Sequence, residues 1–129
     1  MRKRTGDADM SFAKLIADLT SSTSVPAIEH KHLQDACLAG ECHVIDVREP
    51  GEYEAGHIPS AINHPLSQFD PAQLPIDKPV VLVCQAGGRS ARALQAVIAH
   101  GRKDAVHYAG GTGGWRARGG KIAMYILTP

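Results

Sequence analysis

The sequence is poor in cysteine, in aromatic residues and in long apolar runs, and neither charge sign dominates. Three cysteines are an odd number and a poor disulfide framework, which favours a reducing compartment. Fourteen basic residues against thirteen acidic ones leave a net charge of +1, so we do not expect a general nucleic-acid binder. No apolar run approaches the roughly 18 residues that cross a bilayer, and the charged first ten residues do not resemble a signal peptide. We therefore expect a cytoplasmic protein without a membrane segment.

A chain of 129 residues has the size of one domain and can build a core without a metal or disulfide. The residue pattern divides it into an N-terminal extension over residues 1–24, one domain over residues 25–119 and a C-terminal tail over residues 120–129. The tail carries the apolar run Ile122–Leu127. We expect this run to pack within the same chain, and a contact between subunits is the alternative.

The extension is predicted to contain one short amphipathic helix. Residues 1–10 are polar, charged and without a period, so we expect no regular structure there. Residues 11–19 place apolar side chains at helical spacing, with Ser11 as a candidate N-cap, and these side chains are Phe12, Leu15, Ile16 and Leu19. We expect this helix to pack on the domain surface; docking to a partner is the alternative.

Short apolar segments alternate with helical ones between residues 25 and 119. The predicted strands are Val25–Ile28, His43–Val47, Ala61–Asn63, Pro79–Val83 and Ala105–Tyr108. The predicted helices are His30–Ala39 and Arg89–His100, the second with Leu94, Val97 and Ile98 toward the core, and a helical turn is expected at Glu52–Ala55. This alternation predicts an α/β fold with a central parallel sheet of about five strands and helices on both faces.

Cys84 occupies the carboxyl end of the most apolar predicted strand, where ligands bind in open α/β sheets. The glycines that follow, Gly87 and Gly88, let the backbone turn its N–H groups inward, and a helix N-terminus adds partial positive charge. Arg89 adds a full positive charge. All three effects favour a thiolate, so we predict that the pKa of Cys84 lies below the ~8.5 of a free cysteine. An inert buried cysteine is the alternative.

Four segments resemble the rhodanese family in the order in which that family has them. The run Cys84-Gln-Ala-Gly-Gly-Arg89-Ser90 is similar to its active-site loop, C-x-x-G-x-R-S/T. The other three are Asp46-Val-Arg48-Glu49, then Glu52-Tyr53 with Gly56-His57-Ile58-Pro59-Ser60-Ala61, and finally Gly110-Gly-Thr-Gly-Gly-Trp115. Ser60 stands where the family usually has glycine. Together the four segments cover about residues 25–119, which would make that domain a rhodanese domain.

The resemblance implies a rhodanese-like fold and a sulfurtransferase that works through a persulfide on Cys84. Sulfur would pass from thiosulfate or a persulfide donor to cyanide or a thiol acceptor, with Arg89 as the second catalytic residue. The loop residues that would bind the sulfur or its donor are Gln85, Ala86, Gly87, Gly88 and Ser90. No metal or organic cofactor is implied. The expected partners are these small molecules, with an acceptor protein as a further candidate, and we expect neither nucleic acid nor a membrane as a partner.

The remaining residues of these motifs are expected to be structural. Asp46 ends a strand and can accept N–H groups from neighbouring loops, and Arg48 and Glu52 have the spacing of a local ion pair. We expect His57 to have a structural role and Trp115 to anchor the core or a loop.

A metal site is not predicted at the other two cysteines. Cys37 and Cys42 lie near three histidines, His30, His32 and His43, but the spacing matches no compact zinc pattern and Cys37 falls on an apolar helix face.

Two other functions compete with sulfur transfer. Cysteine-dependent phosphatases resemble C-x5-R, whereas four residues separate Cys84 from Arg89 here. A phosphoryl group needs a wider ring of donors than one sulfur atom, so the shorter loop favours sulfur. The other rival is a non-catalytic or sulfur-relay module that binds a partner protein.

Overall fold

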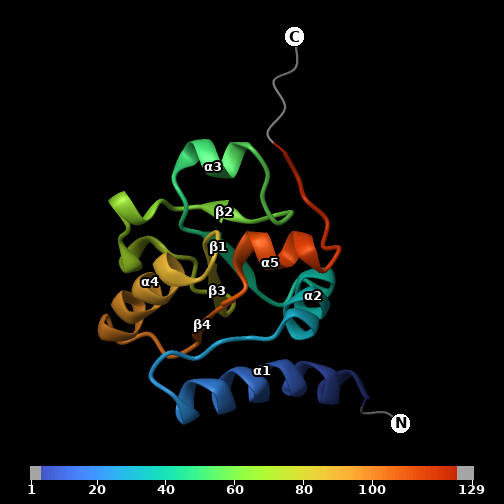
Figure 1. Ribbon diagram of the computed structural model, residues 1–129. Coiled ribbons are helices and arrows are strands. Elements are labelled where there is room, and N and C mark those ends of the chain that lie inside the picture. The colour runs from blue at the N-terminus through green and yellow to red at the C-terminus, as the bar shows by residue number, and fades with distance from the viewer. Residues whose placement is uncertain (1–3, 125–129) are drawn as a thin grey trace.

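The computed structural model describes residues 4–124, with side chains for all of these except residues 4–11 and Ser22 (Figure 1). Its centre is one parallel sheet in the order β2-β1-β3-β4. The strands are β1 (His43–Asp46), β2 (Ile62–Asn63), β3 (Val80–Val83) and β4 (Ala105–His107). All three strand pairings are parallel, so the predicted α/β class with a parallel sheet is confirmed.

The segment predicted as the first strand, Val25–Ile28, borders β4 through a single bridge. The N–H of Ile28 donates to the carbonyl of His107 at 2.9 Å, and the N–H of His107 donates to the carbonyl of Pro26 at 3.0 Å. Pro26 has no N–H to extend this ladder, so the segment stays a bridge at Ala27 rather than a full strand. Four strands and this bridged segment agree with the prediction of about five.

Helices cover both faces of the sheet. The helices are α1 (Arg4–Ser22), α2 (His30–Ala39), α3 (Pro50–Glu54), α4 (Gly88–Ala99) and α5 (Gly111–Ala117). Because side chains alternate along a strand, β3 sends Val81 to a core shared with α1, α2 and α5, and Leu82 to a core shared with α4. Figure 1 shows α4 across the sheet from α2 and α5. Among residues 4–124, no helix is both long and apolar enough to cross a bilayer.

Helix α1 begins at Arg4, so the prediction of no regular structure before residue 11 was wrong for residues 4–10. Apolar residues at helical spacing indicate only the buried part of a helix. Once a helix has nucleated, each further residue adds to it at little cost, so the helix can extend beyond its buried part. Ser11 is therefore a residue within the helix and not its N-cap. The packing expectation is met, because Ile16 is buried in the core and Phe12, Leu15 and Leu19 pack against it.

Two further details of the sequence interpretation differ from the structure. Ile98 is 39% exposed, because it lies at the edge of the buried stripe that includes Leu94 and Val97 on α4. The glycine-rich segment before Trp115 forms α5, which the sequence pattern did not predict. Trp115 is buried, and its indole N–H donates to the carbonyl of Lys121 at 2.7 Å, as expected of an anchor.

The described part of the C-terminal tail packs within the chain. Ile122 contacts the core, and Ala123 forms an antiparallel bridge with His57 through two hydrogen bonds of 2.8 Å. Residues 125–127 of the predicted apolar run lie outside the described residues.

Candidate active site

Cys84 lies at the carboxyl end of β3, and the loop that follows curls around its sulfur. The backbone N–H groups of Gly87 and Ser90 donate to Sγ at 3.1 and 3.3 Å. The thiol is buried, at the point where β3 ends and α4 begins at Gly88. The loop is thus a nest of N–H groups around one sulfur atom, as the paired glycines predicted.

The loop keeps this shape because two glycines permit close backbone contact. Gly87 has a φ of +104°, and a Cβ there would overlap the carbonyl oxygen of Ala109. Gly111 has a φ of +68°, and a Cβ there would overlap the carbonyl oxygen of Gln85. Ala109 and the first turn of α5 therefore pack directly on the Cys84 loop, and the N–H of Thr112 donates to the Cys84 carbonyl at 2.8 Å.

The surroundings of Cys84 favour its charged form. Burial is the largest single influence and by itself raises the pKa of the thiol. Hydrogen bonds from the backbone and hydroxyl of Ser90, and from the backbone of Ala86 and Gly87, together outweigh burial and lower the pKa. The shift has the direction that the sequence predicted, although hydrogen bonds to the loop, rather than Arg89, are its principal favourable causes.

A buried histidine that the sequence interpretation missed completes this network. Ser90 Oγ lies 3.6 Å from Cys84 Sγ and 2.8 Å from Nδ1 of His107. Burial lowers the pKa of His107, which favours the neutral imidazole. A neutral ring that carries its proton on Nδ1 donates to Ser90 Oγ, and the Ser90 hydroxyl proton can then go to the Gly87 carbonyl, 3.2 Å away, or to the Cys84 thiolate. The one sequence signal for this role is a histidine in the otherwise apolar strand Ala105–Tyr108.

Arg89 does not stand free beside Cys84. Its two terminal nitrogens donate to the two carboxylate oxygens of Glu52 at 2.7 and 3.0 Å. Hydrogen bonding to Arg89 is the main reason that the pKa of Glu52 falls to about 2. The predicted local pair between Arg48 and Glu52 was therefore wrong, because the fold brings the more distant arginine to this carboxylate.

Arg48 instead forms a buried ion pair with Asp46 and contacts Gln85 in the loop that follows Cys84. Its guanidinium donates to Asp46 Oδ2 at 2.8 Å, to the carbonyl of Gly56 at 2.7 Å and to Gln85 Oε1 at 3.4 Å. The backbone N–H of Arg48 also donates to Asp46 Oδ1, at 3.0 Å. This pair links the end of β1 to the first residue after Cys84.

His57 contacts Tyr53, within the fold, as expected for a residue with a structural role. Its ring stacks on Tyr53 with centroids 3.8 Å apart, and its Nδ1 lies 2.7 Å from the Tyr53 carbonyl.

The residues that the sequence placed around the sulfur occupy different positions in the loop. Gly87 and Ser90 donate to Sγ directly, and Ala86 contributes a backbone hydrogen bond to it. Gln85 is exposed, and its side chain is held by Arg48. Gly88 is exposed at the start of α4, with open space where a Cβ would lie.

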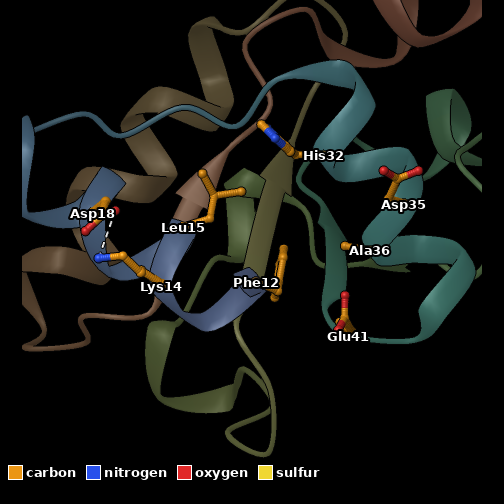
Figure 2. Close-up of a pocket in the computed structure, with 8 residues that line it drawn as sticks. All are labelled: Phe12, Lys14, Leu15, Asp18, His32, Asp35, Ala36 and Glu41. Atoms are coloured by element: carbon orange, nitrogen blue, oxygen red, sulfur yellow. Dashed lines mark ion pairs between the residues drawn. The ribbon is translucent and has the colours of Figure 1, made fainter. Parts of the chain in front are cut away.

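A separate hollow of about 460 Å³ lies between α1 and α2 (Figure 2). Its lining combines apolar and charged side chains, namely Phe12, Lys14, Leu15, Asp18, His32, Asp35, Ala36 and Glu41. Lys14 pairs with Asp18 at 3.7 Å along one wall. The lining contains no cysteine, so this hollow is distinct from the Cys84 loop.

Comparison with known proteins agrees with this loop and fold. The family model described as a rhodanese-like domain matches residues 29–118. The chain therefore belongs to the rhodanese-like domain family.

Two curated relatives and one solved structure show the range of similarity. The uncharacterized protein YqhL of Bacillus subtilis is 45% identical over 84 residues, which are 64% of each protein. The thiosulfate sulfurtransferase GlpE of Pseudomonas syringae is 34% identical over 76 residues, or 57% of this chain and 71% of GlpE. A rhodanese-related protein from Thermoplasma volcanium superposes with a TM-score of 0.69 at 30% identity, over 76% of this chain and 97% of its own. The chain spans less than two thirds of the length of the first curated relatives that it matches.

Proposed function

We propose that the protein is a sulfurtransferase that carries sulfane sulfur as a persulfide on Cys84. The observation that supports this most directly is the pair of N–H groups, from Gly87 and Ser90, that donate to a buried thiol with a lowered pKa. Sequence similarity to the protein named thiosulfate sulfurtransferase GlpE also supports sulfur transfer as the reaction. All three cysteines are free thiols, which suits action in a reducing compartment such as the cytoplasm.

The reaction would proceed in two displacements at sulfur. In the first, the Cys84 thiolate attacks the outer sulfur of thiosulfate, the donor S–S bond breaks, and its electron pair leaves on sulfite. In the second, a thiolate or cyanide attacks the terminal sulfur of the persulfide, and the electron pair of that S–S bond returns to Cys84. The loop N–H groups stabilise negative charge on sulfur at both stages, because they are fixed before the reaction begins.

Arg89 and the loop would share the binding of an anionic donor. Glu52 offsets much of the Arg89 charge and holds the guanidinium in one orientation. We therefore assign the larger part of anion binding to the backbone groups of the loop from Gln85 to Ser90, including the exposed Ala86 and Gly88. Arg89 would orient the donor at the mouth of the loop.

Intact-mass spectrometry tests the proposal directly. The reduced protein is incubated with excess thiosulfate and weighed, alongside a Cys84→Ser variant. We expect the native chain to gain the mass of one sulfur atom and to lose it on adding cyanide, whereas the variant gains nothing.

The absence of sulfur uptake from both thiosulfate and a small-molecule persulfide, by a folded protein, would refute the proposal. Turnover of phosphate esters would then favour a cysteine-dependent phosphatase. Binding of a protein partner without sulfur transfer would favour a non-catalytic module, and transfer of sulfur only to a protein thiol would favour a relay.

A further inference from the structure

Two of the cysteines lie in contact with each other at the carboxyl end of α2. The helix ends at Gly40, whose φ of 68° and ψ of 33° are left-handed. The N–H of Gly40 donates to the carbonyl of Cys37 at 3.2 Å, and the N–H of Glu41 donates to the carbonyl of Ala36 at 2.9 Å. These bonds form a Schellman turn, which folds the chain back so that the thiols of Cys37 and Cys42 form a hydrogen bond.

This thiol pair is remote from the sulfur site. Cys42 directly precedes β1, whose first residue, His43, pairs with Val80 at the start of β3. Cys84 follows the opposite end of β3. A strand of four residues separates the two ends by about 13 Å, so the pair cannot reach a persulfide on Cys84 of the same molecule.

The two thiols have unequal surroundings. Among the described residues, Cys37 but not Cys42 lines a cavity of about 340 Å³, together with Leu38, Ile58 and Trp115. The hydrogen bond from Cys42 lowers the pKa of Cys37 by more than burial raises it. The same hydrogen bond, with burial, raises the pKa of Cys42. Cys37 is thus the thiol that a small molecule can reach from the cavity, and its hydrogen bond with Cys42 favours its thiolate.

We propose that Cys37 and Cys42 form a redox-active dithiol that a small-molecule disulfide, such as glutathione disulfide, oxidises to an intramolecular disulfide. The Cys37 thiolate attacks one sulfur of glutathione disulfide, forms a mixed disulfide and releases one glutathione thiolate. Cys42 gives its proton to that thiolate and attacks the Cys37 sulfur, which expels the second glutathione thiolate; this thiolate takes up from solvent the proton that Cys37 lost on ionising. Two protein thiols are oxidised while one glutathione disulfide is reduced to two thiols, so the step balances.

The fold favours closure of this ring over a lasting mixed disulfide. A disulfide normally requires two distant thiols to meet, whereas the Schellman turn already holds this pair in contact. Both side chains pack against the same core, so Cys42 stays beside the Cys37 sulfur after the first exchange. The cavity beside Cys37 gives a small disulfide access, and the product would join the end of α2 to the start of β1.

The test uses the full chain with Cys84→Ser, which removes the third thiol. The folded protein is treated with glutathione disulfide and weighed intact, then digested without reduction. We expect loss of the mass of two hydrogen atoms, no retained glutathione and one peptide pair joined through Cys37 and Cys42. In the untreated protein, iodoacetamide should label Cys37 before Cys42.

Two matched controls carry Cys37→Ser or Cys42→Ser in the same background. Without its resolving partner, Cys37 in the second control should keep one glutathione, whereas the first control should react far more slowly. Lasting glutathione adducts on the two-thiol chain, or no reaction until the protein is unfolded, would overturn the proposal. The result is independent of sulfur transfer, because the chain tested lacks Cys84.

Discussion

Adding one methyl group at Gly87 or at Gly88 should have opposite effects on stability. Gly87 adopts a φ of +104°, where a side chain costs about 1–2 kcal/mol, and the methyl would also overlap the backbone oxygen of Ala109. A backbone oxygen cannot retreat as a flexible side chain can, and overpacking of this kind costs about 1–3 kcal/mol. We therefore expect Gly87→Ala to lower the free energy of unfolding by about 2–5 kcal/mol.

Gly88→Ala is the matched control, because nothing lies within 4 Å of its added methyl and its φ is not left-handed. Alanine at a compatible position restricts the unfolded chain and stabilises by about 0.4–1 kcal/mol. Urea unfolding of both variants and the native protein measures the two effects. Since m is about 1–3 kcal/mol/M in urea, the midpoint of unfolding of the Gly87 variant should fall by at least about 0.7 M urea.

The same variants test the link between loop shape and thiol chemistry. The added methyl should move the Gly87 N–H away from Sγ and so remove one of the hydrogen bonds that lower the pKa of Cys84. The pKa of Cys84 should therefore rise in Gly87→Ala. It should change little in Gly88→Ala. A Gly87 variant as stable as the native protein, or a Gly88 variant that is markedly weaker, would refute the reasoning about backbone contact.

Three further predictions concern single side chains. Ser90→Ala removes a hydroxyl 3.6 Å from Sγ and should raise the pKa of Cys84, measured from the pH dependence of iodoacetamide labelling in a chain without the other cysteines. Glu52 has its pKa lowered from 4.5 to about 2, so its pair with Arg89 stabilises the folded state above pH 4.5 and is lost as pH falls toward 2. Glu52→Gln should therefore make unfolding free energy depend less on pH in that window, by an amount limited by solvent screening at a side chain 38% exposed. Ser60 is non-glycine at a φ of 71°, and Ser60→Gly should stabilise the protein by about 0.5–1 kcal/mol in urea unfolding.

Each of these has a result that contradicts it. An unchanged labelling profile in Ser90→Ala would mean that the backbone N–H groups alone set the thiol pKa. The Glu52 prediction fails if native protein and variant lose stability in parallel as the pH is lowered. A less stable Ser60→Gly variant would show that the serine has contacts that outweigh its backbone strain.

The loop around Cys84 could be predicted because its causes are local. An apolar run of four residues buried on both faces makes β3, and the glycines and the helix start that follow turn N–H groups toward the thiol. The start of α1 was missed for an equally local reason. The spacing of apolar residues indicates where the buried part of a helix begins, but helix propensity gives no sharp boundary. The residues that extend α1 toward Arg4 are therefore not indicated by the sequence pattern.

Pairing between distant side chains could not be predicted in the same way. Arg48 has Asp46 two residues away and Glu52 four residues away, and sequence spacing alone favoured the second. The fold buries Arg48 with Asp46 and brings Arg89, 37 residues along the chain, to Glu52. Ion pairs follow from which loops share an end of the sheet, and that is set by strand order.

The sequence by itself therefore determined the class of fold, the position of the thiol at a strand end and the direction of its pKa shift. These depend on periodicity, on glycine conformation and on a helix terminus, which act over a few residues. Only the tertiary structure decided that Glu52 pairs with Arg89, that His107 contacts Ser90 and that Cys37 and Cys42 are in contact at the carboxyl end of α2. Those contacts depend on how the parallel strands and a helix-ending turn place separate segments in space, and no local rule encodes that placement.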